Sequence, residues 1–469
     1  MAIEASRSAG ASLKCPTDLD QAMQGEYDLV IVGGGISGAS LLYTVTKFTD
    51  VESVALFEKE PEIAAINSHH TNNSQTLHFG DIETNYSLEK AEEVKEGAEM
   101  VAGYLESNDP DREMHAKRSK MALAVGDDEV DRLERRYDEK GFGDLFPKLD
   151  AIDREEIAEI EPKVVEGREP DTDMLALQTP DGYTVDYGAL ATDFVREVEG
   201  EEGVDVFTGT EVESVNETDD EFLIETERGW YQSDATVVAA GSHSLQIAKE
   251  MGYGEDMSLL PVAGSFFVAD EGLLNGKVYT LQMAKLPFAA VHGDAEVHDQ
   301  GLTRFGPTAK VVPALERGRL STVADFFDVF ELSPDSFLSY ANILADRTLL
   351  PYVLENLLYD LPAVGKRAFL PHVQKVVPTV EASDIERAKG YGGVRPQIVN
   401  TETKSLDMGE AKITGNDVIF NITPSPGAST CLKNAMRDAE QLSEWLDVEF
   451  DVDGFREATI GNFPRGKDE

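Results

Sequence analysis

The chain is poor in cysteine and has no long apolar run. Its 469 residues include two cysteines, Cys15 and Cys431, and neither lies in a C-x-x-C motif. A disulfide framework and a thiolate metal site are therefore excluded, and a reducing cytoplasm is the expected compartment. No stretch reaches about 18 uninterrupted apolar residues, so we predict no transmembrane helix and expect any membrane contact to be peripheral, on the cytoplasmic face. Residues 1–26 are polar, which argues against a secretory signal.

Basic residues are scarce relative to acidic ones. Lys and Arg together number 41, Asp and Glu 89, and the formal net charge is −48. The acids are dispersed along the chain, whereas a nucleic-acid-binding surface requires the opposite sign. A dispersed acidic surface suits concentrated salt, which screens self-repulsion, so we predict a halophilic protein. The alternative is an ordinary acidic protein.

A glycine-rich turn near the beginning of the chain gives the strongest motif. Residues 27–32 form an apolar run typical of a buried parallel strand. Gly33, Gly35 and Gly38 follow in G-x-G-x-x-G spacing and open a helix-forming segment. A second apolar run, 54–57, ends at Glu58. Such a strand, turn, helix and acid bind an adenine dinucleotide, with the pyrophosphate at the helix N-terminus and the acid on the ribose. The alternative is a glycine-rich turn without a nucleotide.

Periodicity and turn signals predict the other elements. Helices are expected at 87–106, 245–251, within 321–361, and at 432–446, and strands at 204–207, 212–215, 222–226, 230–232, 235–240, 393–399, 412–414 and 418–422. We divide the chain into a flexible leader (1–26), a first nucleotide-domain part (27–110), a mostly helical insertion (111–175), a second part (176–261), a substrate domain (262–390), and a third part with a tail (391–469).

Two further segments resemble known flavoproteins. Residues 234–242, DATVVAAGS, resemble the second flavin-domain strand, and residues 424–430, PSPGAST, resemble the C-terminal turn over the flavin ring. With the glycine turn, they resemble the FAD-dependent oxidoreductases of the glutathione-reductase-like fold, and within it the D-amino-acid-oxidase and glycerol-3-phosphate-dehydrogenase group. The resemblance implies FAD as cofactor and an α/β fold, in which a discontinuous Rossmann-type FAD domain carries an inserted α+β substrate domain.

A narrower resemblance lies in residues 72–86, NNSQTLHFGDIETNY, with support from 287–294, 301–309 and 389–397. These stretches look like the malate:quinone oxidoreductases, especially the short epsilon-proteobacterial-type branch. The resemblance implies oxidation of L-malate to oxaloacetate, with electrons passed to a quinone. The related L-2-hydroxyglutarate oxidases share similar segments, so that or another 2-hydroxy-acid or amino-acid oxidase remains an alternative. A flavin-binding protein without dehydrogenase activity is the alternative from another class.

The cofactor residues implied by the motif and the resemblance come from six segments. They are Gly33, Gly35, Ile36, Ser37 and Gly38; Glu58 and Lys59; Asn73, Ser74, Gln75 and Thr76; Val212; Ala240 and Gly241; and Gly427, Ala428, Ser429 and Thr430. A helix N-terminus after Gly427 would also stabilise negative charge on a reduced flavin.

Oxidation of a 2-hydroxy acid needs a base for the hydroxyl proton and a cation for the carboxylate. His78 and His292 are the candidate bases, because neutral imidazole suits this role near neutral pH. Each could instead be a structural histidine, and the sequence does not decide between them. Arg395 corresponds by resemblance to the residue that holds the C1 carboxylate. Arg304 is the candidate for the second carboxylate, with a structural salt bridge as its alternative, and Gln75 is a further substrate contact.

The sequence also bears on two other kinds of site. Histidines and carboxylates show no spacing typical of metal ligands, so no metal site is predicted. The aromatic segment 325–340 is either a membrane- or quinone-facing surface or a helix pair packed within the substrate domain, and packing is the favoured interpretation.

Overall fold

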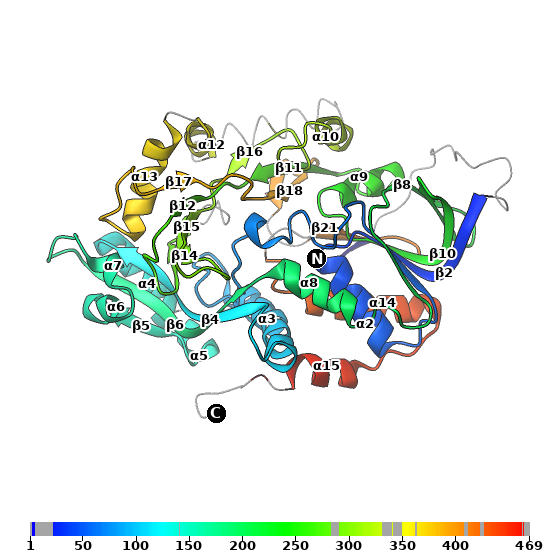
Figure 1. Cartoon of the computed structure of the whole chain (residues 1–469), viewed down its shortest axis with the longest axis horizontal. Helices are drawn as coiled ribbons and strands as arrows, with labels where there is room; N and C mark the ends of the chain where they lie inside the picture. Colours follow the sequence, from blue (N-terminus) through cyan, green and yellow to red (C-terminus); the bar gives the residue numbers. More distant parts are fainter. Residues whose placement is uncertain are drawn as a thin grey trace.

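The computed structural model describes residues 2–4, 22–139, 141–282, 290–330, 340, 349–361, 364–407, 411–422, 426–461 and 463. Within these residues three β-sheets are covered by helices (Figure 1). The glycine turn follows an interior strand of the nine-stranded sheet, and most strands of the predicted substrate segment 262–390 belong to the eight-stranded sheet.

The first sheet contains nine strands drawn from distant parts of the chain. The strand order is β1 (Ala2–Glu4), β20 (Ala411–Thr414), β21 (Val418–Ile422), β10 (Gly229–Val238), β2 (Met23–Val32), β3 (Val54–Phe57) and β7 (Val204–Phe207), while β8 (Val212–Glu217) and β9 (Phe222–Thr226) extend from β10. The neighbours β21, β10, β2, β3 and β7 pair in parallel. The sheet is therefore built from three separate segments of the chain.

Both faces of this sheet are buried, as its nearly continuous apolar strands require. On one face Leu29 and Ile31 pack toward α2 (Ile36–Phe48), α8 (Tyr187–Arg196) and α14 (Cys431–Leu446). On the other face Val30 and Val32 pack toward α9 (His243–Glu250). α3 (Leu88–Asn108) packs against α14 and α15 (Val452–Ile460).

Two further sheets form the other half of the molecule. The eight-stranded sheet has the order β17 (Glu386–Arg387), β12 (Phe267–Ala269), β15 (Thr303–Gly306), β14 (His292–Ala295), β13 (Lys277–Thr280), β4 (His115–Val125), β6 (Met174–Val185) and β5 (Asp150–Asp153). The four-stranded sheet has the order β16 (Lys310–Val311), β11 (Met257–Ala263), β18 (Val394–Asn400) and β19 (Ser405–Asp407).

The segment 111–175 differs from its prediction as a mostly helical insertion. It contains α4 (Asp127–Glu139), α5 (Phe142–Leu145), α6 (Arg154–Ile160) and α7 (Pro162–Val165), but also strands β4 and β5. β4 pairs in parallel with β13, so this segment shares one sheet with the predicted substrate domain. The mostly polar stretch 115–120 has no strand-like alternation, so β4 was not predicted from the sequence. Lys120 can be buried there because its ammonium group pairs with Asp81 at 2.8 Å.

Smaller differences concern strand continuity and the ends of the chain. The strands predicted at 230–232 and 235–240 form the single strand β10, because β2 pairs along almost its whole length. Within the predicted leader 1–26, Ala2–Glu4 pairs with β20, and β2 begins at Met23. The Leu-rich segment contains α10 (Thr322–Phe330) and α12 (Leu349–Tyr359), and α13 (Gly365–Val376), which was not predicted, follows. Across the described helices, none is both long and apolar enough to cross a membrane.

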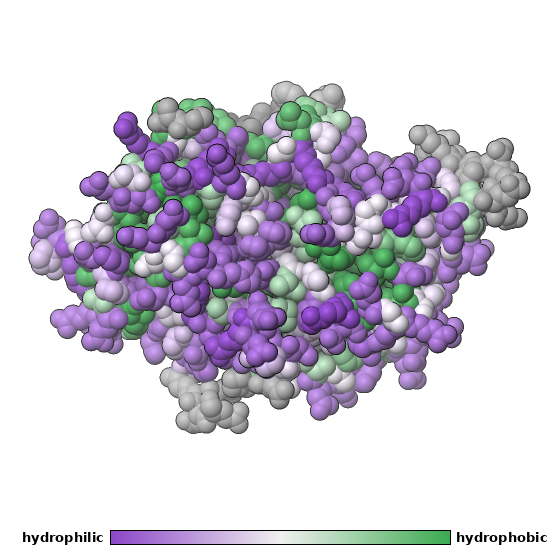
Figure 2. All heavy atoms as spheres, viewed as in Figure 1, coloured by the Kyte–Doolittle hydropathy of each residue, from purple (hydrophilic) through white to green (hydrophobic). Residues whose placement is uncertain are grey.

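The surface is largely hydrophilic on the face shown in Figure 2. This is the outcome expected for a chain with 89 acidic residues. Adaptation to concentrated salt stays a prediction from the acidic composition.

Candidate active site

A cavity of about 640 Å³ lies between the first sheet and strand β18 of the four-stranded sheet. It is lined by the glycine turn, by the end of β3, by the loop 64–78, by the start of β18 and by residues 426–429. The loop 64–78, called the cavity loop below, contributes Asn73, Ser74, Thr76 and His78. The cavity thus collects most of the residues predicted to bind a cofactor.

The glycine turn leaves room for a phosphate group at the cavity wall. Gly33 has φ +110°, and a Cβ there would lie 2.6 Å from the carbonyl oxygen of Ala239. A Cβ on Gly38 would lie 1.9 Å from the carbonyl oxygen of Gly33, so this glycine serves helix packing behind the wall. A Cβ on Gly35 would meet only the Ser68 hydroxyl, at 3.4 Å. The open space beside Gly35, at the N-terminus of α2, fits the pyrophosphate of a dinucleotide.

Glu58 lies at the end of β3 with its carboxylate at the cavity. One oxygen accepts a hydrogen bond from the amide of Gly34 and the other from the amide of Glu60, both at 2.8 Å. Burial raises the pKa of Glu58, while these two amides act in the opposite direction. Each carboxylate oxygen retains a lone pair, so the side chain can also accept hydrogen bonds from a ribose.

Asn73 holds the cavity loop in one conformation. Its side-chain amide donates to the carbonyl oxygens of Asn67, Ser68 and His69 at 3.0–3.2 Å, and its oxygen accepts from the amide of Gln75 at 2.9 Å. Gln75 has φ +55° and points away from the cavity. Its side chain bonds Glu296 at 2.6 Å and the amide of Val297 at 3.1 Å. The side chain of Gln75, predicted to contact cofactor or substrate, therefore does not line the cavity.

His78 forms a histidine–carboxylate pair at the cavity. Its Nδ1 lies 2.5 Å from Glu83 Oε1, and its Nε2 lies 3.4 Å from the hydroxyl of Ser74, which also lines the cavity. Burial would raise the pKa of Glu83, but His78 and Lys120 outweigh it and the pKa is lowered. An ionised Glu83 directs Nδ1–H toward itself and leaves Nε2 as the acceptor on the cavity side. Glu83 was missed from the sequence, where its only signal is its place five residues after His78.

Arg395 reaches the cavity from the start of β18. Gly393 permits this approach, because a Cβ there would lie 2.5 Å from Asn67 Oδ1. Burial lowers the pKa of Arg395, and the nearby ionisable groups are Tyr279, Tyr352 and Tyr86 rather than carboxylates. Within the described part of the chain, no acid pairs with this guanidinium, although the chain has 89 acidic residues. A buried cation of this kind favours an anionic ligand.

His292 lies behind the cavity wall. Its side chain is buried, and the ring stacks on Tyr279 with centroids 4.3 Å apart. Among described residues, neither ring nitrogen has a hydrogen-bond partner, although Asp294 Oδ1 lies 3.4 Å from Nε2. Burial lowers the pKa of His292 to about 3, with Asp294 opposing the shift. Of the two candidate bases, the structure brings only His78 to the cavity.

Arg304 is also removed from the cavity. The side chain is fully buried, and its guanidinium pairs with Asp294 at 2.7 Å and donates to the carbonyl oxygen of Ser74 at 3.2 Å. Lys277 contacts the same two groups at 3.2 and 2.9 Å. This geometry matches the structural alternative for Arg304, namely a salt bridge that supports the cavity loop from behind.

Most of the remaining predicted cofactor residues line the cavity, and one lies behind its wall. The cavity is lined by Ile36, Ser37, Lys59, Val212, Ala240, Gly241, Gly427, Ala428 and Ser429. Thr430 lies behind it against α3, where a Cβ on Gly97 would come within 2.9 Å of Thr430 Cγ2. The residues that sequence reasoning missed include Tyr187, whose hydroxyl donates to the carbonyl oxygen of Thr76 at 2.9 Å.

Comparison with known proteins relates the chain to one group of oxidoreductases. A family model described as malate:quinone oxidoreductase (Mqo) matches residues 25–442. The chain is 42% identical over 443 residues to a probable malate:quinone oxidoreductase of Campylobacter jejuni, covering 92% of this chain and 98% of that protein. It is 38% identical, with the same coverage, to a malate:quinone oxidoreductase of Helicobacter pylori.

The solved structures extend the similarity to the fold. L-alpha-glycerophosphate oxidase from Mycoplasma pneumoniae, described with FAD bound, matches with a TM-score of 0.62 at 18% identity, covering 90% of this chain and 95% of that one. Glycine oxidase from Geobacillus kaustophilus matches with a TM-score of 0.61 at 17% identity, covering 94% and 100%. These matches confirm the predicted glutathione-reductase-like fold.

The buried state of His292 predicts a loss of stability in acid. The folded pKa, about 3, lies below the ordinary value of 6.5, so the unfolded chain binds a proton first as the pH falls. His292 should therefore lower the free energy of unfolding by up to about 2 kcal/mol between pH 7 and pH 5. In urea unfolding, His292→Leu should reduce this pH dependence, whereas an unchanged pH dependence would contradict a buried neutral imidazole.

Proposed function

The chain belongs to the malate:quinone oxidoreductase family, and we propose that it uses the cavity described above to oxidise L-malate to oxaloacetate and pass the electrons to a quinone. The main prediction from the sequence is thus favoured over a 2-hydroxyglutarate oxidase and over a flavin-binding protein without turnover. The cofactor is FAD. One observation supports the assignment of residues. The buried Arg395 has no acid partner among the described residues, and it lines the same cavity as His78, which pairs with Glu83.

The cavity residues fit FAD along its length. Gly35 and the N-terminus of α2 would hold the pyrophosphate, and Glu58 the adenosine ribose. Residues 426–429 precede α14 and would present its N-terminal dipole to the flavin. When bound, FAD supplies the acceptor for the hydride that leaves C2 of the substrate.

Arg395 would bind the C1 carboxylate of malate. Its planar guanidinium can form two parallel hydrogen bonds with a carboxylate, which fixes the orientation of the substrate as well as attracting it. The surrounding tyrosines supply no competing negative charge at neutral pH, since burial raises the pKa of Tyr279 well above its ordinary value. The substrate carboxylate would therefore be the natural partner of this arginine.

His78 would take the proton of the substrate hydroxyl. Its Nε2 is the acceptor on the cavity side, while Glu83 holds the ring through Nδ1 and stabilises the imidazolium that forms. Glu83 is thus proposed as a positioning residue. Arg304 and His292 are left out of the reacting set, because both are buried behind the cavity loop.

Reduction of the bound flavin by substrate tests the proposed function. In anaerobic protein, L-malate should bleach the flavin absorbance, whereas L-2-hydroxyglutarate and amino acids should not. Bleaching by L-2-hydroxyglutarate but not by L-malate would overturn the substrate assignment. A flavin that no candidate reduces would support the non-enzymatic alternative.

Replacement of Arg395 should impair substrate binding strongly. Arg395→Ala should weaken transition-state binding by roughly 2–5 kcal/mol and lower kcat/KM accordingly, because a charged hydrogen-bonded contact is lost. Arg395→Lys should recover only part of this loss, since lysine cannot make the bidentate contact. Arg456→Ala, at an exposed position on α15, is the matched control and should leave kcat/KM unchanged. Unchanged kcat/KM in Arg395→Ala would remove this residue from the site.

The His78–Glu83 pair should affect kcat rather than KM. His78→Gln should lower kcat by roughly 10²–10⁴-fold, the usual contribution of a general base. Glu83→Gln should lower kcat by less and leave KM close to the wild-type value, because the carboxylate positions His78 without contacting substrate. Flavin content should be normal in both variants. Unchanged kcat in Glu83→Gln, or a loss of activity that accompanies loss of flavin, would contradict the positioning role.

The helix α12 offers a surface for the membrane that holds the quinone. Its exposed apolar side chains fall on one helical face: Leu350, Leu354, Leu357 and Leu358, followed by Leu361. Figure 2 shows apolar groups at the edge of the molecule where Figure 1 draws this helix. By contrast, α10 buries Phe326, Val329 and Phe330 and leaves Phe327 exposed, so most of this part of the predicted aromatic segment is packed. Residues 331–339 lie outside the described residues.

We expect this face to rest on zwitterionic rather than anionic lipid, since the chain carries a net charge of −48. In flotation with phosphatidylcholine vesicles, Leu354→Glu/Leu358→Glu should reduce binding at least about 10-fold, because burying each exposed leucine is worth roughly 1 kcal/mol. Leu88→Glu, at a similarly exposed leucine on α3, is the control. Equal binding of the double variant and wild type would contradict this surface.

A further inference from the structure

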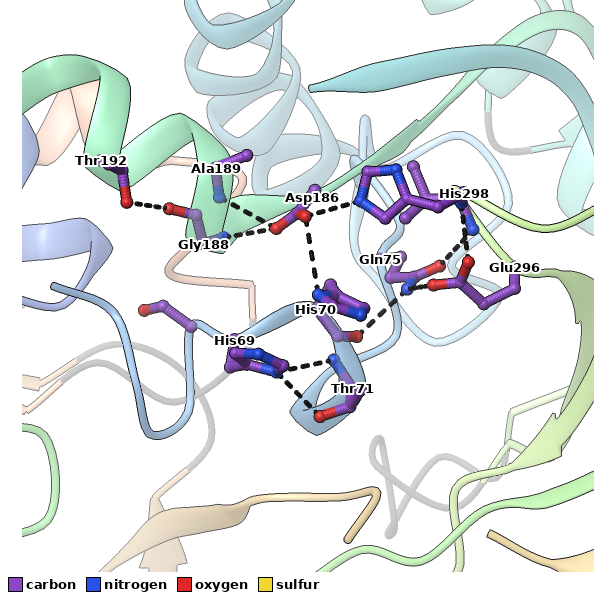
Figure 3. A network of polar contacts seen from close by, with 12 residues as sticks. His69, His70, Thr71, Gln75, Asp186, Gly188, Ala189, Thr192, Glu296 and His298 are labelled. Carbon is purple, nitrogen blue, oxygen red and sulfur yellow. Dashed lines mark hydrogen bonds and ion pairs between the residues drawn. The ribbon is translucent and has the colours of Figure 1, made fainter. Parts of the chain in front are cut away.

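Three potential metal-ligating side chains converge beside the cavity loop. His70 begins the short helix η1 (His70–Asn72), Asp186 is the N-cap of α8, and His298 lies between β14 and β15. Figure 3 shows both imidazoles directed at the Asp186 carboxylate. The distances to Asp186 Oδ2 are 2.7 Å from His298 Nε2 and 3.6 Å from His70 Nδ1.

The spacing of these atoms suits one ion after small side-chain movements. One ligand atom from each residue lies within 4.8 Å of the other two. In a tetrahedral zinc site with bonds of about 2.0–2.2 Å, ligand atoms are roughly 3.3–3.6 Å apart. His298 has 45% of its side chain exposed and can make the required shift, and its exposure also gives solvent and ions access.

The carboxylate is already oriented for such a role. Asp186 Oδ1 accepts hydrogen bonds from the amides of Gly188 and Ala189, both at 2.9 Å, and this leaves Oδ2 facing the histidines. Outer hydrogen bonds of this kind fix metal ligands in proteins. The capping of α8 thus holds the carboxylate whether or not an ion is bound.

The ring of His70 is also held in position. It stacks on the ring of His69 with centroids 4.4 Å apart. This contact restrains the imidazole in the orientation from which Nδ1 faces Asp186.

We propose that His70, Asp186 and His298 form a binding site for a divalent transition-metal ion such as Zn²⁺. Two imidazoles and one carboxylate favour Zn²⁺, Co²⁺ or Ni²⁺ over Mg²⁺ and Ca²⁺, which prefer oxygen ligands. Water would complete the coordination. Sequence spacing does not predict this site, because each of the three ligands comes from a different region of the chain.

The ion would have a structural role in the cavity wall. It joins η1 of the cavity loop to the start of α8 and to the connection between β14 and β15. Asn72 and Asn73, two and three residues after His70, line the cavity, while the three ligands do not. Binding at this position would therefore stabilise the loop without contact with substrate.

Zinc binding to the holoprotein tests the site directly. After treatment with a chelating resin, wild type should bind one equivalent of Zn²⁺ in calorimetry at about pH 7.5, because metal affinity falls when protons compete for the ligands at lower pH. His298→Gln and His70→Gln should each weaken binding at least about 100-fold, since loss of even an outer-shell partner costs 10–100-fold. His372→Gln is the matched control, because His372 is a surface histidine that lies 3.4 Å from Glu355.

Thermal unfolding supplies an independent measurement. Zn²⁺ should raise the Tm of wild type and His372→Gln but not of His298→Gln or His70→Gln, and Mg²⁺ should raise none. The side-chain amide introduced by His298→Gln can still donate to Asp186, so metal-free Tm values should stay close to wild type. Equal Zn²⁺ affinity in wild type and both site variants, or no stoichiometric binding in wild type, would overturn the proposal. Neither measurement depends on malate oxidation.

Discussion

The cavity depends on a buried ionic cluster behind its loop. Asp294 pairs with Arg304 and Lys277, and both cations also donate to the carbonyl oxygen of Ser74. Burial would raise the pKa of Asp294, but the two cations lower it to about 2, so the carboxylate stays charged. Removing one member of such a cluster typically costs about 3–5 kcal/mol, because an unpaired charge remains buried. The cluster thereby fixes Ser74 and, with it, the position from which His78 reaches the cavity.

Two arginines show how partners decide the role of one residue type. Arg304 lies on β15, where Asp294 of the neighbouring strand β14 is directly opposite and neutralises it. Arg395 lies on β18 opposite Val262, and tyrosines surround its guanidinium. The first arginine therefore stabilises the fold. The second has no acid partner among the described residues, and this difference is the basis for proposing it as the site of the substrate carboxylate.

The fold was predictable where neighbouring residues in the sequence determine the backbone conformation. The glycine turn, the apolar strands on either side of it and the amphipathic helix α3 all appear close to their predicted bounds, because backbone conformation and periodicity are local properties. Strand β4 was missed, since its polar first half becomes compatible with a sheet only through partners such as Asp81 and the antiparallel strand β6. Those partners are distant in sequence and leave no periodic pattern.

By itself the sequence determined the family, the cofactor class and most of the cavity wall, because the glycine turn, Glu58, the cavity loop and Arg395 lie in short motifs whose chemistry is local. Only the tertiary structure separated His78 from His292 and Arg395 from Arg304. That separation rests on burial and on charged neighbours, which are set by strand pairing between distant segments. Glu83 belongs to the same class, since a carboxylate becomes the partner of an imidazole only when the folded loop brings the two within hydrogen-bonding distance.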